Sequence, residues 1–256
     1  MLDFYIRRGP TIFQSTSFKS RFGAIRQLFR PKHSHEVLRN ELVGILGDKL
    51  LRDSTCRLAI PTYDAVAGRI YIMKTCHQSD LTFDGRAKAA DVALATSAAP
   101  TYFAASKFPL HQSASYVDGG IWANCPAMVG VAEAIAFLGQ SPANLDVLSI
   151  GATSSPFNIA KQRNAGAMGW NVGIIGLMFE AQVEAARAQA KLIAGNFHRI
   201  DSIVPANQYA LDRADPDTIE RLAVLGRGEA SKQANLAIVR QRFLDGAYAP
   251  AYENCC

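Results

Sequence analysis

Two neighbouring stretches decide the fold. Residues 91–103 read DVALATSAAPTYF and residues 116–126 read YVDGGIWANCP. The small-residue run Ala95–Ala99 favours a close contact between a helix and a sheet, because short side chains let two backbones approach. Asp118 stands at a strand end before two glycines, a pattern typical of a turn residue or a cap. Taken separately, neither stretch identifies a chemistry.

Strand and helix signals alternate on both sides of these stretches. Short runs rich in β-branched or aromatic residues predict strands at residues 57–63, 69–74, 146–150 and 199–203, the first two joined by a short turn around Ala67-Gly68. Apolar residues at helical spacing predict helices at residues 2–8, 34–46, 87–97, 127–138, 165–192 and 216–226, and a last helix carrying Leu236, Val239 and Phe243. This alternation predicts an α/β fold with a mixed or parallel sheet covered on both faces.

Three helix boundaries carry specific signals. Gly9-Pro10 is a stop signal for the first helix, and Ser34 can cap the second. Asp215-Pro216 is a cap followed by a proline suited to the first helical position. We find no internal repeat or linker, so we expect one domain.

The composition is that of a folded protein. The chain has 256 residues, of which 49% are hydrophobic and 19% charged. These values exclude disorder, collagen and coiled coil, and they provide enough apolar surface for a full core. The longest apolar stretch, residues 170–179, is far shorter than the roughly 20 residues of a membrane-spanning helix.

The net charge of +5 belongs to one end of the chain. Residues 1–32 hold seven basic residues and one acidic residue, a local +6, so the other 224 residues sum to −1. General nucleic-acid binding is therefore not expected. Within residues 18–32, apolar side chains at helical spacing are surrounded by Lys and Arg. This pattern fits either an amphipathic helix on an anionic membrane surface or a core-packing helix with a basic rim.

The cysteines and histidines give no sign of a metal or cofactor site. The five cysteines contain no C-x-x-C pair, which disfavours a zinc site and a disulfide framework and indicates the cytoplasm. The five histidines lack metal-ligand spacing, and there is no glycine-rich phosphate loop. We therefore expect neither metal nor cofactor, and a nucleotide-binding domain of the Rossmann type is disfavoured.

A serine nucleophile is also missing. No G-x-S-x-G elbow occurs in the chain. The nearest match, residues 139–143, places Pro142 after the serine, where a backbone N–H normally stabilises the oxyanion. Residues 95–99 have small flanks but follow a helix rather than a strand.

The order and spacing of the two stretches resemble the patatin-like phospholipase family. That family has an ATSAAP-T-x-F segment, then D-G-G or D-G-A, then N-x-P, and here these correspond to Ala95–Phe103, Asp118–Gly120 and Asn124–Pro126. Cys125 departs from the family's usual Asn-Asn-Pro and is expected to be a structural change. Residues 149–151 and the Lys74–His77 segment are similar to two further family segments. The resemblance covers about residues 1–155.

The resemblance implies a three-layer α/β sandwich and a lipid acyl hydrolase with a Ser-Asp dyad. The family aspartate corresponds to Asp118, and Gly119 and Gly120 would let the backbone turn so that the carboxylate faces the serine. Asn124 would support the motif. The implied partner is a phospholipid or other lipid substrate, and the implied chemistry needs no histidine.

Two family motifs are not found, the glycine-rich oxyanion loop and the G-x-S-x-G elbow. We therefore expect residues 1–155 to be the C-terminal portion of a patatin-like domain and residues 156–256 a helical extension packed on it. The chain would be inactive alone, because loss of the serine and of the oxyanion donors each costs orders of magnitude in rate. The alternative is a non-catalytic module that binds lipid or a partner through residues 18–32. A cytoplasmic location with peripheral membrane contact fits either interpretation.

Overall fold

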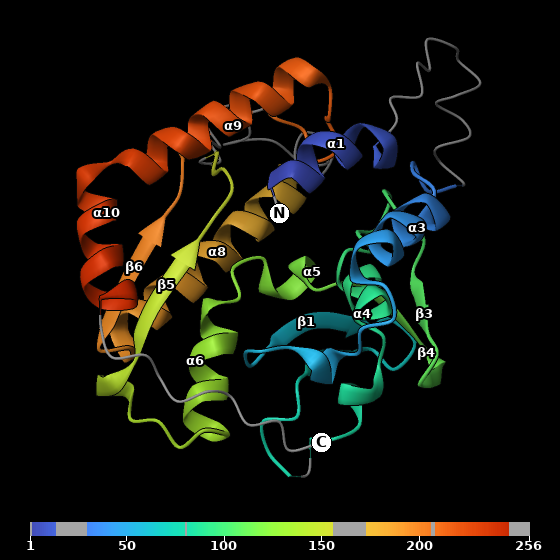
Figure 1. Cartoon of the computed structure of the whole chain (residues 1–256), viewed down its shortest axis with the longest axis horizontal. Coiled ribbons are helices and arrows are strands. Elements are labelled where there is room, and N and C mark those ends of the chain that lie inside the picture. The colour runs from blue at the N-terminus through green and yellow to red at the C-terminus, as the bar shows by residue number, and fades with distance from the viewer. Residues whose placement is uncertain (1, 14–29, 80, 156–172, 206–207, 246–256) are drawn as a thin grey trace. The chain divides into compact units, whose positions relative to one another are not determined.

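The computed structural model describes residues 2–13, 30–79, 81–155, 173–205 and 208–245 (Figure 1). The described chain divides into two compact units. The first unit comprises the residues up to Ile121 and Leu211–Glu220, and the second comprises Trp122–Ala210 and the residues from Arg221 onward. The division into residues 1–155 and 156–256 stays a prediction.

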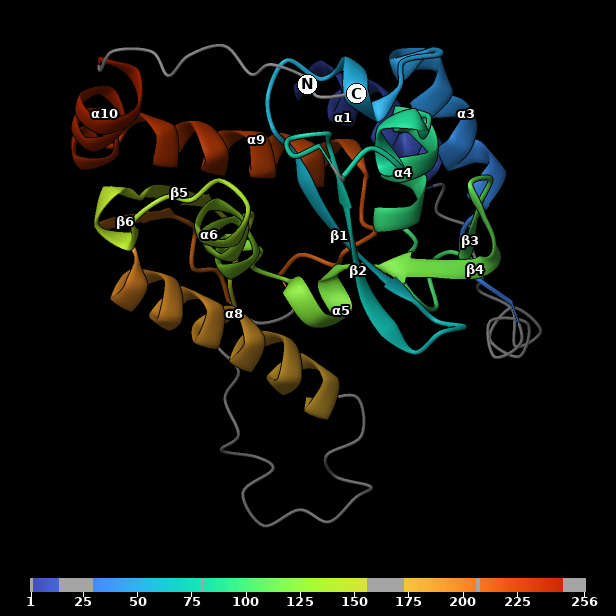
Figure 2. The ribbon, with the colours of Figure 1, turned by 90° about the horizontal axis from the view of Figure 1, so that it is seen from below.

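The first unit contains a four-stranded antiparallel sheet in the order β2-β1-β4-β3 (Figure 2). Its strands are β1 (Ala59–Asp64), β2 (Arg69–Lys74), β3 (Ser106–Phe108) and β4 (His111–Asp118). The predicted hairpin of β1 and β2 is present. Asp64 stabilises its turn by accepting the N–H groups of Val66 and Ala67, and Gly68 takes a φ of 66° that favours glycine.

The helices of the first unit are α1 (Leu2–Ile12), α3 (His35–Leu46) and α4 (Ala89–Thr96), with short 3₁₀ turns η1 (Leu51–Asp53) and η2 (Asp84–Arg86). The predicted cap of α3 is present, since the Ser34 hydroxyl accepts the N–H of Val37. The predicted stop at Gly9-Pro10 is wrong, because α1 continues to Ile12. Ile12 is buried, and the N–H of Phe13 reaches the carbonyl of Gly9 at 2.9 Å, so the turn after the proline is kept.

Helix α4 supplies side chains to both hydrophobic clusters of the first unit. Val92 and Ala95 belong to a cluster with Met73 and Tyr116 from the sheet, whereas Leu94 belongs to a second one. The second cluster joins α1, α3 and the loop after α4 through Ile12, Leu38, Leu94 and Phe103. The loop after α4 is therefore fixed by packing.

The second unit contains a parallel pair of strands, β5 (Asp146–Ile150) and β6 (Asn196–Ile200), with the helices α6 (Ala127–Ala136), α8 (Gly173–Ile193) and α10 (Gln233–Val239). It also holds η3 (Pro142–Asn144) and a π-helical turn, η5 (Arg240–Leu244). The helices α5 (Gly120–Ala123) and α9 (Pro216–Ser231) contribute residues to both units.

Two element boundaries in the second unit differ from those that the sequence predicts. Strand β5 lies where it was predicted, but β6 begins three residues before the predicted start at Arg199. Helix α9 does not end near Gly226 and runs on to Ser231. A glycine inside a helix lowers the stability of the helix by only about 1 kcal/mol relative to alanine, so the helix can continue through Gly226. The side-chain amide of Asn235 donates a hydrogen bond to the carbonyl of Glu229 near the helix end.

The α/β class predicted from the sequence is confirmed, and the described strands form antiparallel and parallel pairs. No helix in the described ranges is long and apolar enough to cross a membrane. Cys76 is buried and disulfide-bonded, which the cysteine spacing did not predict, whereas Cys56 and Cys125 are free thiols. The expected amphipathic segment at residues 18–29 and the start of the expected helix at residues 165–172 lie outside the described residues.

Candidate active site

Asp118 is the last residue of β4, which is an inner strand of the first unit's sheet. It pairs with Thr62 of β1, and its N–H donates to the carbonyl of Ala98 at 3.0 Å. The position of the aspartate backbone is therefore set from two sides, by a strand and by the loop after α4. This places the two stretches that decide the fold in direct contact.

Gly119 is required by a close backbone contact. A Cβ atom at this position would lie 2.1 Å from the carbonyl oxygen of Pro61. The hydroxyl of Thr96, at the end of α4, donates to the same carbonyl at 2.7 Å. Strand β1, helix α4 and the turn after β4 thus meet at Pro61, and only glycine fits at the turn.

The side chain of Asp118 is held by the next turn. Its Oδ1 atom accepts the N–H of Gly120, the first residue of α5, at 2.7 Å. Within the described part of the chain, no donor reaches its second oxygen. Burial raises the pKa of Asp118, and the hydrogen bond from Gly120 opposes this rise. The result is a half-buried carboxylate with one oxygen fixed and the other available to accept a proton.

The small-residue run behaves as the sequence suggested. Ala95 and Ala98 are almost fully buried, and the Ala98 carbonyl accepts the N–H of Asp118, so the loop after α4 contacts the end of β4. Thr101, three residues after Ala98, has a φ of 72°, an unusual value for a β-branched residue. Such strain persists only where surrounding contacts impose it.

Those contacts come from a partly buried cluster of Lys32, His33 and Asp212 that the sequence did not reveal. The N–H groups of Lys32 and His33 donate to the carbonyls of Thr101 and Tyr102 at 3.0 and 2.8 Å. Both side chains contact Asp212, with His33 Nε2 2.8 Å from its Oδ2 atom. Burial alone would raise the pKa of Asp212, but the hydrogen bonds from Lys32 and His33 hold it below its ordinary value.

Asn124 and Cys125 are the other two residues singled out in the motif. Asn124 is exposed and does not cap α6, whose N-cap position is Pro126 without a side-chain hydrogen bond. Asn124 belongs to the second unit and Asp118 to the first. Cys125 is buried 3.8 Å from the Ser149 hydroxyl, as a small structural residue would be.

Two further segments that resembled the family are also packed. The hydroxyl of Thr75 accepts the N–H of Leu58 at 2.9 Å, so this residue joins the strands rather than facing a ligand. A Cβ atom on Gly151 would lie 2.4 Å from Nη2 of Arg199, which pairs with Asp201 at 2.7 Å. Glycine after β5 therefore makes room for a partly buried ion pair.

No described serine or histidine hydrogen-bonds to Asp118, and the described residues contain no group of three His, Cys, Asp or Glu side chains that could hold a metal ion. The geometry therefore provides a proton acceptor without a nucleophile in hydrogen-bond contact. A carboxylate in this state can serve as a general base or position a reacting hydroxyl.

A pH-dependent stability difference is expected for Asp118→Asn. Because the folded-state pKa of Asp118 is raised above its ordinary value of 3.8, the ionised carboxylate destabilises the fold as pH rises through that range. Asparagine removes the charge and keeps an oxygen for the Gly120 N–H. We expect the Tm of the variant to exceed that of the wild type at pH 7 and the difference to shrink toward pH 4. Thermal unfolding of both proteins across this range checks it, and a constant difference would contradict it.

Comparisons with known proteins agree on the family. The family model described as Patatin-like phospholipase matches residues 5–131. The cGAMP-activated phospholipase of Vibrio cholerae is 28% identical over 257 residues, covering 90% of this chain and 72% of the relative. The Escherichia coli protein of the same name is also 28% identical, over 81% of this chain and 64% of its own length.

A plant relative matches the part of the chain that holds the motifs. Patatin-like protein 4 of Arabidopsis thaliana is 34% identical over 135 residues, which cover 51% of this chain and 33% of the plant protein. The chain thus spans about two thirds of the bacterial relatives and one third of this plant relative. The family match and these relatives show that this chain belongs to the patatin-like phospholipase family.

Proposed function

We propose that the chain is the aspartate-bearing part of a lipid acyl hydrolase, a phospholipase or carboxylic ester hydrolase, with a Ser-Asp dyad. Asp118 is the base of this dyad. The observation that supports it best is the half-buried Asp118 carboxylate, which has a raised pKa and one oxygen that accepts no hydrogen bond from the described residues. The serine comes from polypeptide outside residues 1–256, since the chain contains no G-x-S-x-G sequence.

In the proposed reaction, Asp118 first takes the proton of the serine hydroxyl while the serine oxygen attacks the ester carbonyl. The tetrahedral intermediate collapses, and Asp118 returns the proton to the leaving alcohol, which leaves an acyl-enzyme. Water then attacks the acyl group while Asp118 accepts its proton, and that proton goes back to the serine as the fatty acid leaves. Gly119 and Gly120 hold the carboxylate in place through both steps.

Residues 1–256 alone are expected to hydrolyse no ester. The proposed reaction needs a nucleophile and oxyanion donors, and loss of either costs about 10²–10⁶-fold in rate. The measurement is p-nitrophenyl butyrate hydrolysis by the purified chain, compared with the product of any in-frame coding sequence upstream of Met1. Turnover by the 256 residues that depends on Asp118 would contradict a nucleophile outside them.

A cyclic dinucleotide is a natural candidate for regulation. Two of the bacterial relatives are named as cGAMP-activated, and they match 90% and 81% of this chain. We therefore include activation by cGAMP in the proposal. The esterase assay with the longer product is to be run with and without cGAMP, and equal rates over a wide concentration range would remove this part.

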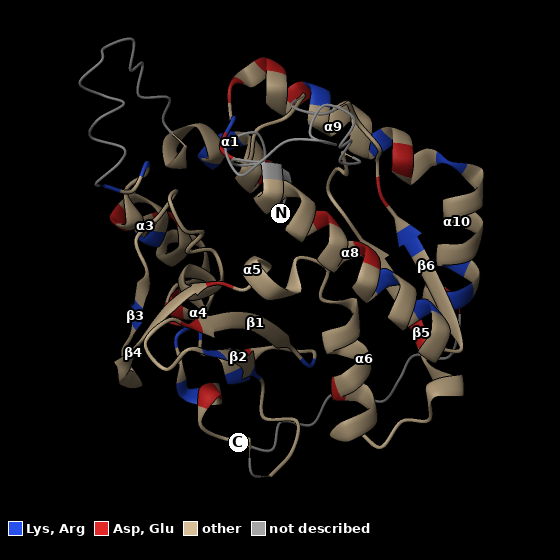
Figure 3. Ribbon diagram, turned by 180° about the vertical axis from the view of Figure 1, so that it is seen from behind, with Lys and Arg blue, Asp and Glu red and all other residues tan. Residues whose placement is uncertain are grey.

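The second candidate is a non-catalytic module that binds a membrane surface. It is favoured by the local +6 of residues 1–32. Over the described elements, by contrast, Lys and Arg are interleaved with Asp and Glu, as on α3 and α9 (Figure 3). Basic residues near an anionic membrane each contribute about 1 kcal/mol to binding. Co-sedimentation with phosphatidylserine vesicles at low and high salt tests this candidate, and binding without salt dependence would reject it.

The proposal also includes a cellular location and a division of the chain into two portions. A cytoplasmic enzyme with peripheral membrane contact fits a phospholipid substrate. Residues 156–256 would extend the portion at residues 1–155. Cell fractionation tests the location, and recovery of the protein only outside the cytoplasmic and membrane fractions would reject it.

A further inference from the structure

Residues 211–220 belong to the first unit, although the chain before and after them belongs to the second. The carboxylate of Asp212 contacts the Nζ atom of Lys32 and, at 2.8 Å, the Nε2 atom of His33. The side chains of Asp212 and His33 are 8% and 4% exposed, and the His33 ring packs against that of Phe103 with centroids 5.7 Å apart. Because a buried carboxylate needs hydrogen bonds, these contacts hold Asp212, Lys32 and His33, here called the Asp212 cluster, in one arrangement.

The backbone of the Asp212 cluster pairs with the loop after α4, residues 97–103. The N–H of Lys32 donates to the carbonyl of Thr101, and that of His33 donates to the carbonyl of Tyr102. Thr101 has a φ of 72°, a value that costs a β-branched residue conformational energy. Without the two hydrogen bonds, Thr101 would relax to a negative φ and the loop would change its path. The Asp212 cluster therefore holds the loop in a strained form.

The same loop holds the backbone of Asp118. The N–H groups of Tyr102 and Phe103 both donate to the carbonyl of Ala99, at 3.1 and 2.9 Å. The carbonyl of the preceding residue, Ala98, accepts the N–H of Asp118 at 3.0 Å. A change in the path of the loop would therefore move the acceptor of this N–H, and with it the turn in which the Asp118 carboxylate is buried. Hydrogen bonds and the loop backbone thus connect the Asp212 cluster to Asp118 within the first unit.

We propose that Asp212 is a positioning residue for Asp118, because by holding Lys32 and His33 it keeps the loop after α4 in the form that fixes the turn of the base. This role rests on the proposed function, in which Asp118 takes the proton of a serine and must lie within hydrogen-bond reach of it. A misplacement of about 1 Å can lower a rate by about 100-fold, so the place of the carboxylate matters. Asp212 lies outside residues 5–131, the part that the family model matches.

The first test is an NMR titration of the Asp118 carboxyl group in residues 1–256 carrying Asp212→Ala. Burial is the larger of the two effects on the pKa of Asp118, so a loosened turn that admits water should lower this pKa. We expect a fall of about half a pH unit or more, a threefold rise in the ionisation constant. A folded variant with an unchanged pKa of Asp118 would overturn the proposal.

Asp212→Asn keeps the test decisive if the alanine variant does not fold. Asparagine retains an oxygen for the Nε2 atom of His33 but loses the charge opposite Lys32. The pKa of Asp118 should then fall in the same direction by a smaller amount. An unchanged or raised pKa in this variant would count against the positioning role in the same way.

Thr101→Gly separates positioning from a general loss of stability. Glycine adopts a φ of 72° without strain, so the loop should keep its path even when the Asp212 cluster is broken. Added to Asp212→Ala, this substitution should therefore recover more than half of the change in the pKa of Asp118, and alone it should leave that pKa unchanged. If glycine recovered none of the change, the path through the loop would be wrong.

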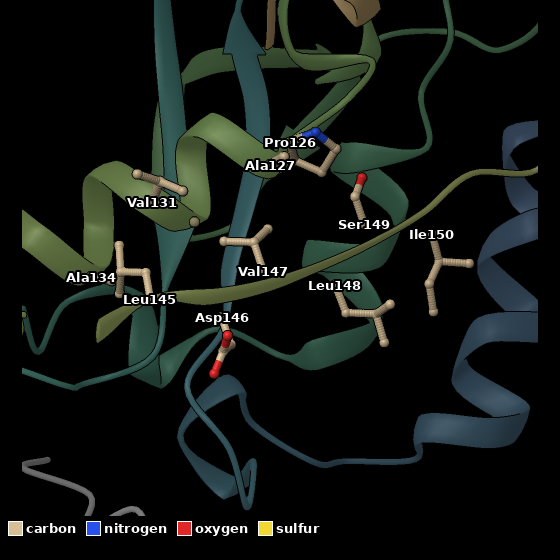
Figure 4. Close-up of a pocket in the computed structure, with 11 residues that line it drawn as sticks. Pro126, Ala127, Val131, Ala134, Leu145, Asp146, Val147, Leu148, Ser149 and Ile150 are labelled. Atoms are coloured by element: carbon tan, nitrogen blue, oxygen red, sulfur yellow. The ribbon is translucent and has the colours of Figure 1, made fainter. Parts of the chain in front are cut away.

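Two controls lower stability without touching the Asp212 cluster. Asp215→Ala acts in the same segment and removes the cap of α9, since Asp215 accepts the N–H and the hydroxyl of Thr218. Val131→Ala acts in the second unit, where Val131 is buried on α6 beside a cavity of about 390 Å³ that β5 also lines (Figure 4). Both should lower the Tm and leave the pKa of Asp118 unchanged. A fall of this pKa in either control as large as in Asp212→Ala would overturn the proposal.

The second test is ester hydrolysis by the longer, serine-containing product. Asp212→Ala should lower kcat by about 10–100-fold and change KM by less than about twofold, because a displaced base affects the proton transfer and not substrate binding. Thr101→Gly should restore kcat in part, and the two controls should leave it unchanged. The titrations use residues 1–256 without substrate, so the two proposals fail separately. An inactive longer product would sink the proposed function even if Asp212→Ala lowers the pKa of Asp118, and an active one whose kcat Asp212→Ala leaves unchanged would sink the positioning role alone.

Discussion

Asp118→Asn is expected to lower the rate of ester hydrolysis by the longer, serine-containing product by about 10³–10⁴-fold, with little change in fold. Asparagine can still accept the Gly120 N–H, and the Asp118 backbone keeps its bond to the Ala98 carbonyl. What is lost is the proton acceptor. The loss should therefore appear in kcat rather than in KM, because a carboxylate that only takes a proton contributes little to ground-state binding.

The control for this variant is Asp48→Asn. Asp48 is exposed and pairs with Lys88 on the surface, so its removal should leave kcat unchanged and cost at most a small part of the stability. Circular dichroism and thermal unfolding of each variant report on the fold. A kcat for Asp118→Asn within a few-fold of the wild type would contradict the role of Asp118 as base.

Gly119→Ala is expected to be the most destabilising single-methyl change near the site. The new Cβ atom would lie 2.1 Å from the backbone oxygen of Pro61, which cannot rotate away as a flexible side chain could. Overpacking of this kind costs about 3 kcal/mol, which corresponds to a fall in Tm of about 6–12 °C for a protein of this size. Differential scanning calorimetry of residues 1–256 measures it without any need for activity.

Gly44→Ala is the matched control for that substitution. Gly44 lies inside α3, in the same unit, and its Cβ position is open. Alanine there should stabilise the helix by about 1 kcal/mol and raise the Tm. If Gly119→Ala and Gly44→Ala shifted the Tm in the same direction, the close contact with Pro61 would not be what fixes the turn.

Local signals in the sequence predicted most of the elements. The Ser34 cap, the turn before β2 and the apolar strand β5 each depend on a few neighbouring residues, and each is present. The errors arise where packing overrides a local preference. Helix α1 continues past Pro10 because Ile12 is buried.

For the candidate site, the sequence predicted Asp118 but not the contacts that hold it in place. Asp118 and its glycines stand out as a motif, whereas the carbonyls of Ala98 and Pro61 that define the turn have no sequence signature. Asp212 pairs with His33 across 179 positions, and no periodicity relates the two.

The central claim is that Asp118 activates a serine from outside residues 1–256, and labelling with a fluorophosphonate probe tests it most directly. The probe reacts with an activated serine, and mass spectrometry locates the modified residue. We expect no label on residues 1–256 alone, one labelled serine upstream of Met1 in the longer product, and at least tenfold slower labelling of that serine in Asp118→Asn. A labelled serine within residues 1–256, or labelling that Asp118→Asn does not slow, would contradict the claim.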